Sequence, residues 1–538
     1  MTINPERNPR LPEHYDQVPM DWVGDWIGRR TLYTPDREAV YDAGSNRRFT
    51  YRQLNRRANQ VGAFFIDHLG LDQGDVVCLL SHNRVEALDI YFAAGKTGII
   101  LAPLSYRLVA AELSELLDIL QPRALFYGTN LKSSLMHVNF PRSLQTRIAI
   151  DELPEGVYAT EILSSSPKEV NRPLAMNQPY LYVHTGGSTG RPKVCVVTHR
   201  QMIWNSFNLL ATASGALGWE GRELVTFPFY HIGGWNTVTP IVHIGGSLVL
   251  MRRFDADRAL GLIQEEGVTH FGAVESVLRF LMQSPRFAAA DLKSMKYINS
   301  AGAPCAPDVM RAFWNKGVPL TQSYGLTEAG PSNFMVVPHG FSPQDLERQA
   351  GTIGHPMFHC EAHLLDCSGA VLEQPGEVGE LCFRNPNCFE GYLKDNLGGR
   401  QVVDSRGWVH SGDLAKLEKD GSIRIVGRVD NVFVSGGENV SPEEVERVLE
   451  RHPAVARACV VDVPDRRWGR VGWAAIVPRE EAKPTVEELK TICRTSLARF
   501  KVPKHVEIVD RLPLTGAGKV DRRSLHVWIL QKHAGGEP

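Results

Sequence analysis

The chain has 538 residues, of which 43% are hydrophobic, so it can bury more than one core and is long enough for several domains. Lys and Arg number 59 and Asp and Glu number 60, which gives a net charge of -1 and no electrostatic case for nucleic acid or an anionic membrane as the main partner. The N-terminus lacks an apolar signal-peptide core and no apolar run reaches the length of a membrane span, so we expect a cytoplasmic protein without an integral membrane segment.

The nine cysteines are scattered along the chain. The closest group, Cys360, Cys367, Cys382 and Cys388, lacks the paired short spacing of a zinc site. Reduced, buried thiols are therefore the favoured interpretation over metal ligands.

The first part of the chain, to about residue 154, alternates helical patterns with short apolar strands. Thr50 is the predicted N-cap of a helix that runs to a break at Gly70. After it we expect strands and helices in alternation, at 75–80, 85–97, 99–104 and 110–120. This alternation is typical of an α/β layer fold.

The stretch from His184 to Lys193 is rich in glycine and hydroxyl side chains and lies between predicted strands at 179–183 and 194–197. Glycine lets backbone N–H groups turn toward a ligand, the hydroxyls add donors, and Lys193 adds a mobile positive charge. The pattern therefore predicts a hairpin tip that holds phosphate groups. A glycine-rich surface turn uses the same residue types and stays open as an alternative.

A P-loop of the Walker type is disfavoured for the same stretch. That loop needs Gly-Lys-Ser/Thr at the start of a helix, whereas Arg191 and Pro192 separate Gly190 from Lys193 here. Pro192 also removes a backbone donor and fixes its own φ.

Polar and small residues follow several later strands, at the end where α/β sheets collect ligand groups. Thr327 offers a donor to phosphate and Glu328 a hard oxygen suited to Mg²⁺, although the start of an ordinary polar loop is equally open. His231 and Trp235 follow a strand near residue 225 and could line a pocket. A lone histidine is more often a packing residue.

From Gly351 to Arg428 the pattern changes to short strands with glycine turns, which predicts a β-rich subdomain. Asp413 could accept hydrogen bonds from ribose hydroxyls and Arg428 could face phosphate or ribose. A surface salt bridge is the open alternative for both residues. A small α/β domain then begins near Asp430.

Taken together, these stretches resemble the acyl- and aryl-adenylate-forming superfamily, which includes acyl-CoA synthetases, the adenylation domains of peptide synthetases and firefly luciferase. The resemblance covers nearly the whole chain. Its most specific parts are Thr185 to Lys193, Tyr324 to Glu328, His410 to Asp413 with Gly427 to Asp430, and Gly516 to Lys519. The implied fold is α/β, with a large N-terminal domain at 1–429, a β-rich subdomain at about 351–429, and a small mobile C-terminal domain at 430–538.

The resemblance also implies roles for individual residues. The residues implied in binding ATP or CoA are Thr185, Gly186, Gly187, Ser188, Thr189, Gly190, Lys193, Gly302, Ala303, Pro304, Tyr324, Gly325, Asp413, Arg428, Gly436 and Gly437. The residues implied in catalysis are His231, Thr327, Glu328 and Lys519. Glu328 is the implied Mg²⁺ ligand, Lys519 the bridge between the substrate carboxylate and the α-phosphate, and Asp430 the hinge.

The acyl pocket is the least determined part of this assignment. Trp235, Val274, Glu275 and Ala301 are the implied lining residues, and the aromatics suit either a fatty chain or a ring. Glu275 in a pocket would repel a second carboxylate, but a surface or salt-bridged glutamate is the favoured interpretation.

The sequence departs from the family pattern in two places. Val194 stands where glycine is usual after the loop lysine, and we expect it to stiffen the loop exit. The stretch from Ala273 to Ser276 replaces a Val-Pro-Thr-like pattern, which predicts an altered geometry of the acyl pocket or the nucleotide side.

The activity implied by the resemblance is that of a CoA ligase, which converts a carboxylic acid, ATP and CoA into acyl-CoA, AMP and pyrophosphate. Two alternatives stay open: an enzyme that loads a separate acyl carrier protein, and a catalytically idle nucleotide-binding member of the fold. Because the sequence ends soon after Lys519, we expect no carrier or reductase domain. The oligomeric state is also open and includes a homodimer.

Overall fold

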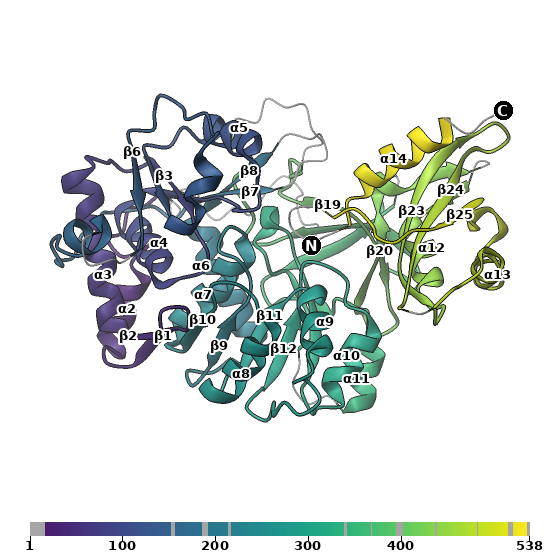
Figure 1. The fold of residues 1–538 in the computed structure, drawn as a ribbon, viewed down its shortest axis with the longest axis horizontal. Helices are drawn as coiled ribbons and strands as arrows, with labels where there is room; N and C mark the ends of the chain where they lie inside the picture. Colours follow the sequence, from purple (N-terminus) through teal and green to yellow (C-terminus); the bar gives the residue numbers. More distant parts are fainter. Residues whose placement is uncertain are drawn as a thin grey trace, which may run out of the picture. The chain divides into compact units, whose positions relative to one another are not determined.

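The computed structural model describes residues 17–151, 156–185, 192–213, 217–337, 342–366, 368–393, 402–435, 438–480, 482–514 and 520–534. The chain forms two compact units (Figure 1). The first comprises residues 1–361 and 383–409, and the second comprises residues 362–382 and 410–538. The domain boundary expected at residue 430 stays a prediction.

The first unit contains a mostly parallel six-stranded sheet in the order β6-β5-β3-β4-β7-β8. Only β8 runs antiparallel to its neighbour, β7. The strands are β3 (Val76–Leu80), β4 (Ile100–Pro103), β5 (Ala124–Tyr127), β6 (Thr146–Ala149), β7 (Pro179–Thr185) and β8 (Lys193–Thr198).

A nine-stranded sheet of the same unit has the order β15-β14-β13-β12-β11-β9-β10-β1-β2, and its central strands are parallel. The strands are β1 (Glu38–Asp42), β2 (Arg47–Thr50), β9 (Arg222–Val225), β10 (Ser247–Leu250), β11 (His270–Ala273), β12 (Tyr297–Ser300), β13 (Leu320–Tyr324), β14 (Phe334–Met335) and β15 (His355–Pro356).

Helices connect these strands, and the residues that favour their formation lie within or directly beside each helix. Thr50 caps its helix as predicted, in a capping box in which Thr50 and Gln53 exchange hydrogen bonds of 3.3 and 2.9 Å. The helix differs from the prediction in its last part, where α3 gives way to a π-helical turn at Phe64–His68 before Gly70. The α-helices are α2 (Trp26–Tyr33), α3 (Tyr51–Ala63), α4 (Val85–Thr97), α5 (Ala110–Leu120), α6 (His199–Thr212), α7 (Ile232–Ile244), α8 (Ala256–Glu266), α9 (Glu275–Gln283), α10 (Pro307–Trp314) and α11 (Pro343–Gln349).

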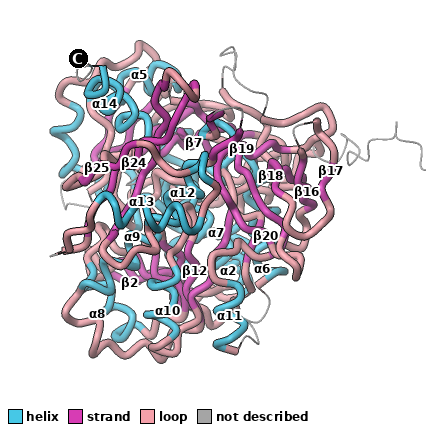
Figure 2. Tube along the Cα trace, turned by 90° about the vertical axis from the view of Figure 1, so that its right-hand side faces the viewer, coloured by secondary structure: helices cyan, strands magenta, loops and turns pink. Residues whose placement is uncertain are grey.

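The second unit is built around two five-stranded sheets, with orders β17-β16-β18-β19-β20 and β22-β21-β24-β23, the second extended by β25 on β24 (Figure 2). Its elements are β16 (Glu361–Leu365), β17 (Val371–Leu372), β18 (Val378–Arg384), β19 (Val409–Leu417), β20 (Ile423–Arg428), β21 (Phe433–Ser435), β22 (Glu438–Val440), β23 (Val455–Asp465), β24 (Gly469–Pro478), β25 (His505–Ile508), α12 (Pro442–Leu449), α13 (Val486–Ser496) and α14 (Arg522–Ala534). The α/β class expected from the sequence, with a C-terminal domain, is confirmed.

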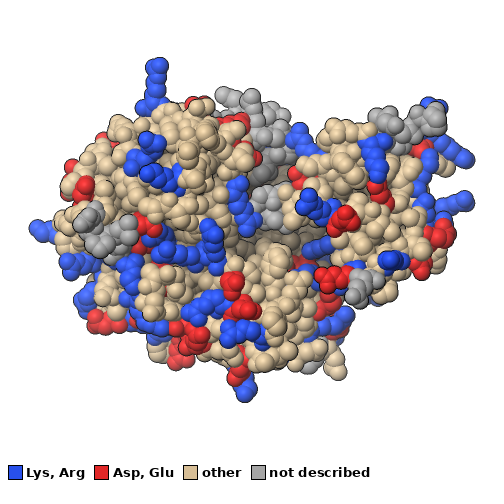
Figure 3. All heavy atoms as spheres, viewed as in Figure 1, with Lys and Arg blue, Asp and Glu red and all other residues tan. Residues whose placement is uncertain are grey.

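Surface charge on the face shown in Figure 3 is mixed, with acidic and basic side chains interspersed. This agrees with the near-zero net charge of the sequence.

His199 is the first residue of α6, directly after β8, and its side chain is fully buried in the first unit. The ring stacks on Tyr180 with centroids 4.6 Å apart, and neither ring nitrogen has a hydrogen-bond partner among the described residues. Burial disfavours the charged imidazolium and lowers the pKa of His199 to about 3.

This burial predicts an acid-sensitive fold. An unfolded histidine titrates near a pKa of about 6.5, so between that pH and about 3 the unfolded chain binds the extra proton and the folded chain does not. The neutral His199 therefore does not lower the free energy of unfolding above about pH 6.5. As the pH falls below that value the free energy of unfolding declines, and at about pH 5 it is lower by roughly 2 kcal/mol. Urea unfolding followed by tryptophan fluorescence at neutral and acidic pH measures this decline.

The matched variants are His199→Phe, which keeps an aromatic ring on Tyr180, and His137→Phe at an exposed histidine. We expect a smaller acid-induced loss of stability in the first and an unchanged loss in the second. An equal loss in wild type and His199→Phe would show that this imidazole is not the source.

Candidate active site

The predicted glycine-rich loop is described at its two ends. Strands β7 and β8 form the predicted antiparallel hairpin, in which Thr185 lies opposite Lys193. The predicted site residues Gly186, Gly187, Ser188, Thr189, Gly190, Gly436, Gly437 and Lys519 lie outside the described residues. The phosphate-holding role of the loop therefore stays a prediction.

A cation, a phenol and a carboxylate meet beside this hairpin. The Lys193 Nζ lies 4.8 Å from the centroid of the Tyr392 ring, and the Tyr392 hydroxyl donates to Glu328 Oε1 at 2.7 Å. Tyr392 therefore contacts two predicted site residues, Lys193 and Glu328. The sequence analysis did not identify Tyr392 as a site residue.

Tyr392 reaches this position through backbone pairing. Val196 N donates to Gly391 O at 3.0 Å, and Leu393 N donates to Val194 O at 2.8 Å, so residues 391–393 extend the sheet beyond β8. This pairing joins segments far apart in the sequence, so no local pattern around Tyr392 marks it as part of the site.

Hydrogen bonds to its backbone carbonyl oxygens fix the short 3-10 turn at Thr327–Ala329 that carries Glu328. The Gln201 side-chain amide donates to Thr327 O at 2.7 Å, and Phe389 N donates to Glu328 O at 2.9 Å. The side-chain amides of Asn385 and Asn387 donate to Ala329 O. The turn is therefore held from both α6 and the 385–389 segment.

Cys195 lies next to the same charged groups. Burial, followed by the nearby Glu328 carboxylate, raises the pKa of Cys195 well above its usual value, while Thr185 and Lys193 act in the opposite direction. Cys195 is thus a protonated thiol at neutral pH. The cysteines that the structure describes are all free, as expected.

Cys382 lies in a group of polar side chains that the sequence did not indicate. Its Sγ lies 3.4 Å from His410 Nδ1, and that nitrogen lies 3.2 Å from Glu380 Oε2. Glu380 Oε1 also accepts from Gly412 N at 3.1 Å. This group anchors the start of the His410 to Asp413 stretch to β18.

Asp413 and Arg428 pair across β19 and β20, where they are opposite one another in register. Arg428 Nη1 lies 3.0 Å from Asp413 Oδ1, and the carboxylate is nearly buried while the guanidinium is half exposed. The structure thus has the salt bridge that the sequence left open, and contact with a ribose stays a prediction. Asp430 lies in the 3-10 turn Val429–Asn431, and its hinge role also stays a prediction.

Residues of the predicted acyl pocket and of the predicted nucleotide site gather at the carboxyl ends of β11 and β12. Ala301 N donates to Ala273 O at 3.0 Å. Gly302 has a φ of +80°, and a Cβ on it would lie 3.6 Å from the Val274 side chain. The structure therefore brings Val274, Ala301 and Gly302 together, followed directly by Ala303 and Pro304.

Tyr324 ends the neighbouring strand β13, and Gly325 follows it directly. The Tyr324 ring packs edge-on against Phe334 and Phe383. A side chain on Gly325 would collide with the carbonyl oxygen of Pro331, so the close backbone approach there requires glycine.

Glu275 and Trp235 both have packing partners inside the protein. Glu275 is buried and pairs with Arg279 at 2.7 Å, which is the salt-bridged alternative left open by the sequence. Trp235 is fully buried and stacks between Tyr91 and Phe229, with centroid distances of 4.3 and 4.5 Å. Contact of either residue with a substrate stays a prediction.

His231 is the exposed N-cap of α7. Its Nδ1 accepts from Gly233 N at 3.1 Å, which satisfies one donor at the start of the helix. A catalytic role for His231 stays a prediction.

Comparison with known proteins decides the family. The family model for AMP-binding enzymes matches residues 29–393, and the model for the AMP-binding enzyme C-terminal domain matches residues 444–519. The chain belongs to the AMP-binding enzyme family. The resemblance to the adenylate-forming superfamily, which the sequence analysis identified, is thereby confirmed.

Two curated relatives of this AMP-binding enzyme are CoA ligases by name, and a third, of Streptomyces coeruleorubidus, is named as a fatty acid–acyl-carrier-protein ligase. A feruloyl-CoA synthase of Amycolatopsis sp. is 33% identical over 93% of this chain and 97% of its own length. An indoleacetate–CoA ligase of Aromatoleum aromaticum is 30% identical over 95% of this chain and 98% of its own length. These relatives support an acid:CoA ligase as the general activity.

A solved structure shares the fold of this AMP-binding enzyme. The o-succinylbenzoate CoA synthetase from Bacillus subtilis, in complex with ATP and magnesium ion, is 27% identical and has a TM-score of 0.80 over 93% of this chain and 99% of that chain. None of the helices described in this AMP-binding enzyme is long and apolar enough to cross a membrane.

The hydrogen bond between Tyr392 and Glu328 provides a test of this part of the site. We expect Tyr392→Phe to weaken binding of ATP with Mg²⁺ by roughly three- to tenfold, because one net hydrogen bond that orients a carboxylate is lost while the ring over Lys193 remains. Calorimetric titration with ATP and Mg²⁺ measures the change.

The control is Tyr182→Phe on β7, whose hydroxyl has no hydrogen bond to the described residues, and we expect wild-type affinity from it. Wild-type affinity in Tyr392→Phe as well would remove Tyr392 from the nucleotide site.

Proposed function

We propose that this protein is an ATP-dependent carboxylic acid:CoA ligase that works through an acyl-adenylate. The observation that carries the proposal is the group formed by Lys193, Tyr392 and Glu328 at the end of the hairpin, in a chain that belongs to the AMP-binding enzymes. An ammonium and a carboxylate that both contact one tyrosine suit a polyphosphate together with its divalent cation.

The proposed reaction has two steps. A carboxylate oxygen attacks the α-phosphorus of ATP, so an acyl–phosphate bond forms and the bond to the β-phosphate oxygen breaks, releasing pyrophosphate. The thiol of CoA then attacks the acyl carbon, AMP leaves, and the thiol proton is released. Activation is needed because a free carboxylate would have to expel oxide, which is a poor leaving group.

The chain's own residues supply positioning and charge in this proposal. The loop from Thr185 to Lys193 holds the β- and γ-phosphates, Thr327 contacts phosphate, and Tyr324 packs beside the adenine. Asp413 and Arg428 hold the ribose. Because one carboxylate is already ordered there, Glu328 is the residue that would hold Mg²⁺, whose positive charge offsets that of the phosphates.

Lys519 is proposed to lie between the substrate carboxylate and the α-phosphate. Two anions that must approach each other repel, so a cation between them stabilises the transition state. Asp430 is the proposed hinge of the C-terminal domain, and Gly436 and Gly437 are proposed to leave room for the thin pantetheine arm of CoA.

We propose aromatic carboxylic acids as the first substrate class. The support is that two relatives carry the names of aromatic acids, ferulate and indoleacetate. In addition, Tyr106 packs edge-on against Tyr230, directly before His231, with centroids 5.0 Å apart. Fatty acids are the alternative class.

The deciding experiment is pyrophosphate release with aromatic acids and with short, medium and long fatty acids, each with and without CoA. We expect acid-dependent release and acyl-CoA formation, with Lys519→Ala slower by roughly a hundred- to a thousandfold because one transition-state contact is lost. Lys483→Ala, an exposed lysine in the same domain, serves as the control and should keep wild-type rates.

Other results point to other functions. Pyrophosphate release without capture by CoA would favour loading of a separate acyl carrier protein. No release with any acid would contradict the ligase and favour an idle nucleotide-binding member of the family.

A further inference from the structure

Glu380, Cys382 and His410 form a compact group of metal-ligating side chains in the second unit. A carboxylate, a thiol and an imidazole each offer one ligand atom, and these atoms all lie within 4.8 Å of one another. The group shares no residue with the site around Tyr392, which belongs to the first unit.

Two neighbouring strands bring the three residues together. β18 and β19 are paired in the five-stranded sheet (Figure 2). Because side chains alternate between the two faces of a strand, Glu380 and Cys382 project from the same face of β18. His410 is near the start of β19 and contacts both of them. The histidine is distant in sequence, so no short ligand spacing of the kind found in zinc sites indicates the group.

The distances in the group are close to those between the ligands of a tetrahedral zinc ion. Cys382 Sγ lies 3.4 Å from His410 Nδ1, and that nitrogen lies 3.2 Å from Glu380 Oε2. Zinc bonds of about 2.3 Å to sulfur and about 2.0–2.2 Å to nitrogen and oxygen place tetrahedral ligands about 3.6 Å apart for sulfur and nitrogen and about 3.4 Å apart for nitrogen and oxygen. Small shifts of the side chains would therefore let one cation bind all three atoms.

The shared ring nitrogen of His410 gives a second reason to expect a cation. A neutral imidazole nitrogen either carries a proton or accepts one, so Nδ1 cannot accept from the Cys382 thiol and donate to the Glu380 carboxylate at the same time. A divalent cation bound to all three atoms would satisfy them together. The thiolate and the carboxylate would balance its charge.

The surroundings orient the ligands and leave the group accessible. Gly412 N donates to the other carboxylate oxygen, Glu380 Oε1, at 3.1 Å, which directs Oε2 toward His410. Cys382 is buried, whereas the side chains of Glu380 and His410 are 14% and 21% exposed. A cation could therefore enter from the solvent and reach the thiol past these two side chains.

The next residue on this face of β18 is a cation whose charge is compensated. Arg384 pairs with Glu361 at 2.6 Å, and its guanidinium lies over the Trp408 ring with 5.1 Å to the centroid. Its charge is thus offset by a carboxylate of its own and does not depend on Glu380.

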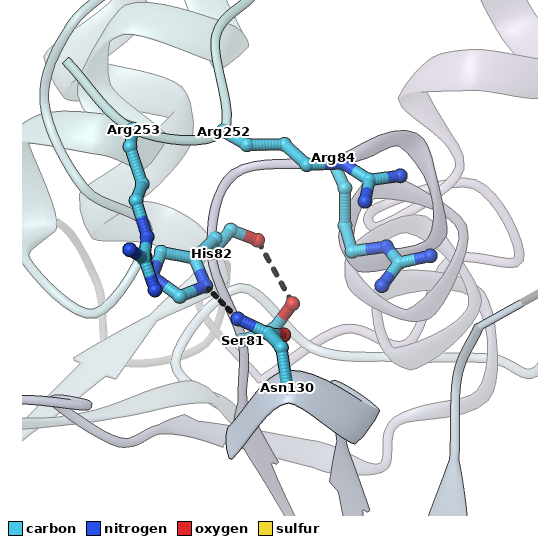
Figure 4. Close-up of a pocket in the computed structure, with 6 residues that line it drawn as sticks. All are labelled: Ser81, His82, Arg84, Asn130, Arg252 and Arg253. Carbon is cyan, nitrogen blue, oxygen red and sulfur yellow. Dashed lines mark hydrogen bonds between the residues drawn. The ribbon is translucent and has the colours of Figure 1, made fainter. Parts of the chain in front are cut away.

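A polar pocket in the first unit has the opposite chemistry. Its histidine is accompanied by three arginines and by no carboxylate or thiol (Figure 4). The residues that line it are Ser81, His82, Arg84, Asn130, Arg252 and Arg253. The positive charge of this lining would repel a metal ion, so a histidine in a polar pocket is not sufficient for a cation site.

We propose that Glu380, Cys382 and His410 bind Zn²⁺, with water as the fourth ligand. Binding converts the thiol to a thiolate and releases its proton. Sulfur and nitrogen ligands favour zinc over Mg²⁺, which prefers oxygen ligands in octahedral geometry. The bound ion would connect β18 to the first part of β19, the strand that also carries Asp413.

The test is a zinc titration of the full chain, stripped of metal and kept reduced, in competition with a chromophoric zinc chelator and with Mg²⁺ in excess. We expect wild type to bind one Zn²⁺ per chain. Cys382→Ala should weaken this binding by roughly a hundredfold or more and Glu380→Gln by roughly tenfold or more, because loss of even an outer partner of a metal ligand costs roughly ten- to a hundredfold.

The matched control is Cys493→Ala on α13, which removes another buried thiol of the second unit and should leave the affinity within about twofold of wild type. Co²⁺ in place of zinc gives a second readout, because a cobalt–thiolate bond absorbs in the near ultraviolet. This absorption should be present in wild type and Cys493→Ala and absent in Cys382→Ala.

The cobalt spectrum of wild type needs no variant, so the test stays decisive if Cys382→Ala fails to fold. Glu380→Gln moreover keeps an oxygen that can accept from Gly412 N. Three results would overturn the proposal: no saturable zinc binding by wild type, equal affinities in wild type and both ligand variants, or a cobalt complex of wild type without thiolate absorption. Because none of these measurements needs turnover, the zinc site and the proposed ligase activity can fail separately.

Discussion

The pairing of residues 391–393 with β8 is the interaction on which the candidate site depends. Two backbone hydrogen bonds, from Val196 to Gly391 and from Leu393 to Val194, form an isolated β-bridge between Tyr392 and Cys195 beside the hairpin. This bridge holds Tyr392 in a position between Lys193 and Glu328. Arg200 reinforces the arrangement from α6, because its guanidinium donates to Pro386 O and pairs with Glu390. The 385–393 segment thus contacts both β8, which carries Lys193, and the turn that carries Glu328.

Local signals in the sequence predicted much of the fold. The helices at 85–97 and 110–120 have the bounds that were predicted, and the capping box at Thr50 is present. The hairpin around the glycine-rich stretch was also predictable, because two apolar strands flank a run of turn residues. These features depend on residues within a few positions of one another, which is the range over which propensity and capping act.

Partners far apart in the sequence could not be predicted in the same way. The contacts that Tyr392 and His410 make depend on which strands become neighbours, and that is set by long-range packing. Glu275 is an intermediate case, because Arg279 lies one helical turn later and the i,i+4 spacing already favours their ion pair. Val194 replaces an expected glycine, and its side chain is buried in an apolar cluster with Cys78 and Leu125.

The protonated state of Cys195 has a consequence for redox chemistry. Disulfide exchange requires a thiolate, and the raised pKa of Cys195 keeps the thiolate population very small at neutral pH. An enzyme that handles free CoA encounters both the thiol and its oxidised disulfide form. In the proposed reaction, the Cys195 thiol beside Glu328 and Lys193 would therefore be protected from forming a mixed disulfide with oxidised CoA. The proposed nucleotide site would stay unmodified when the ratio of CoA to its disulfide changes.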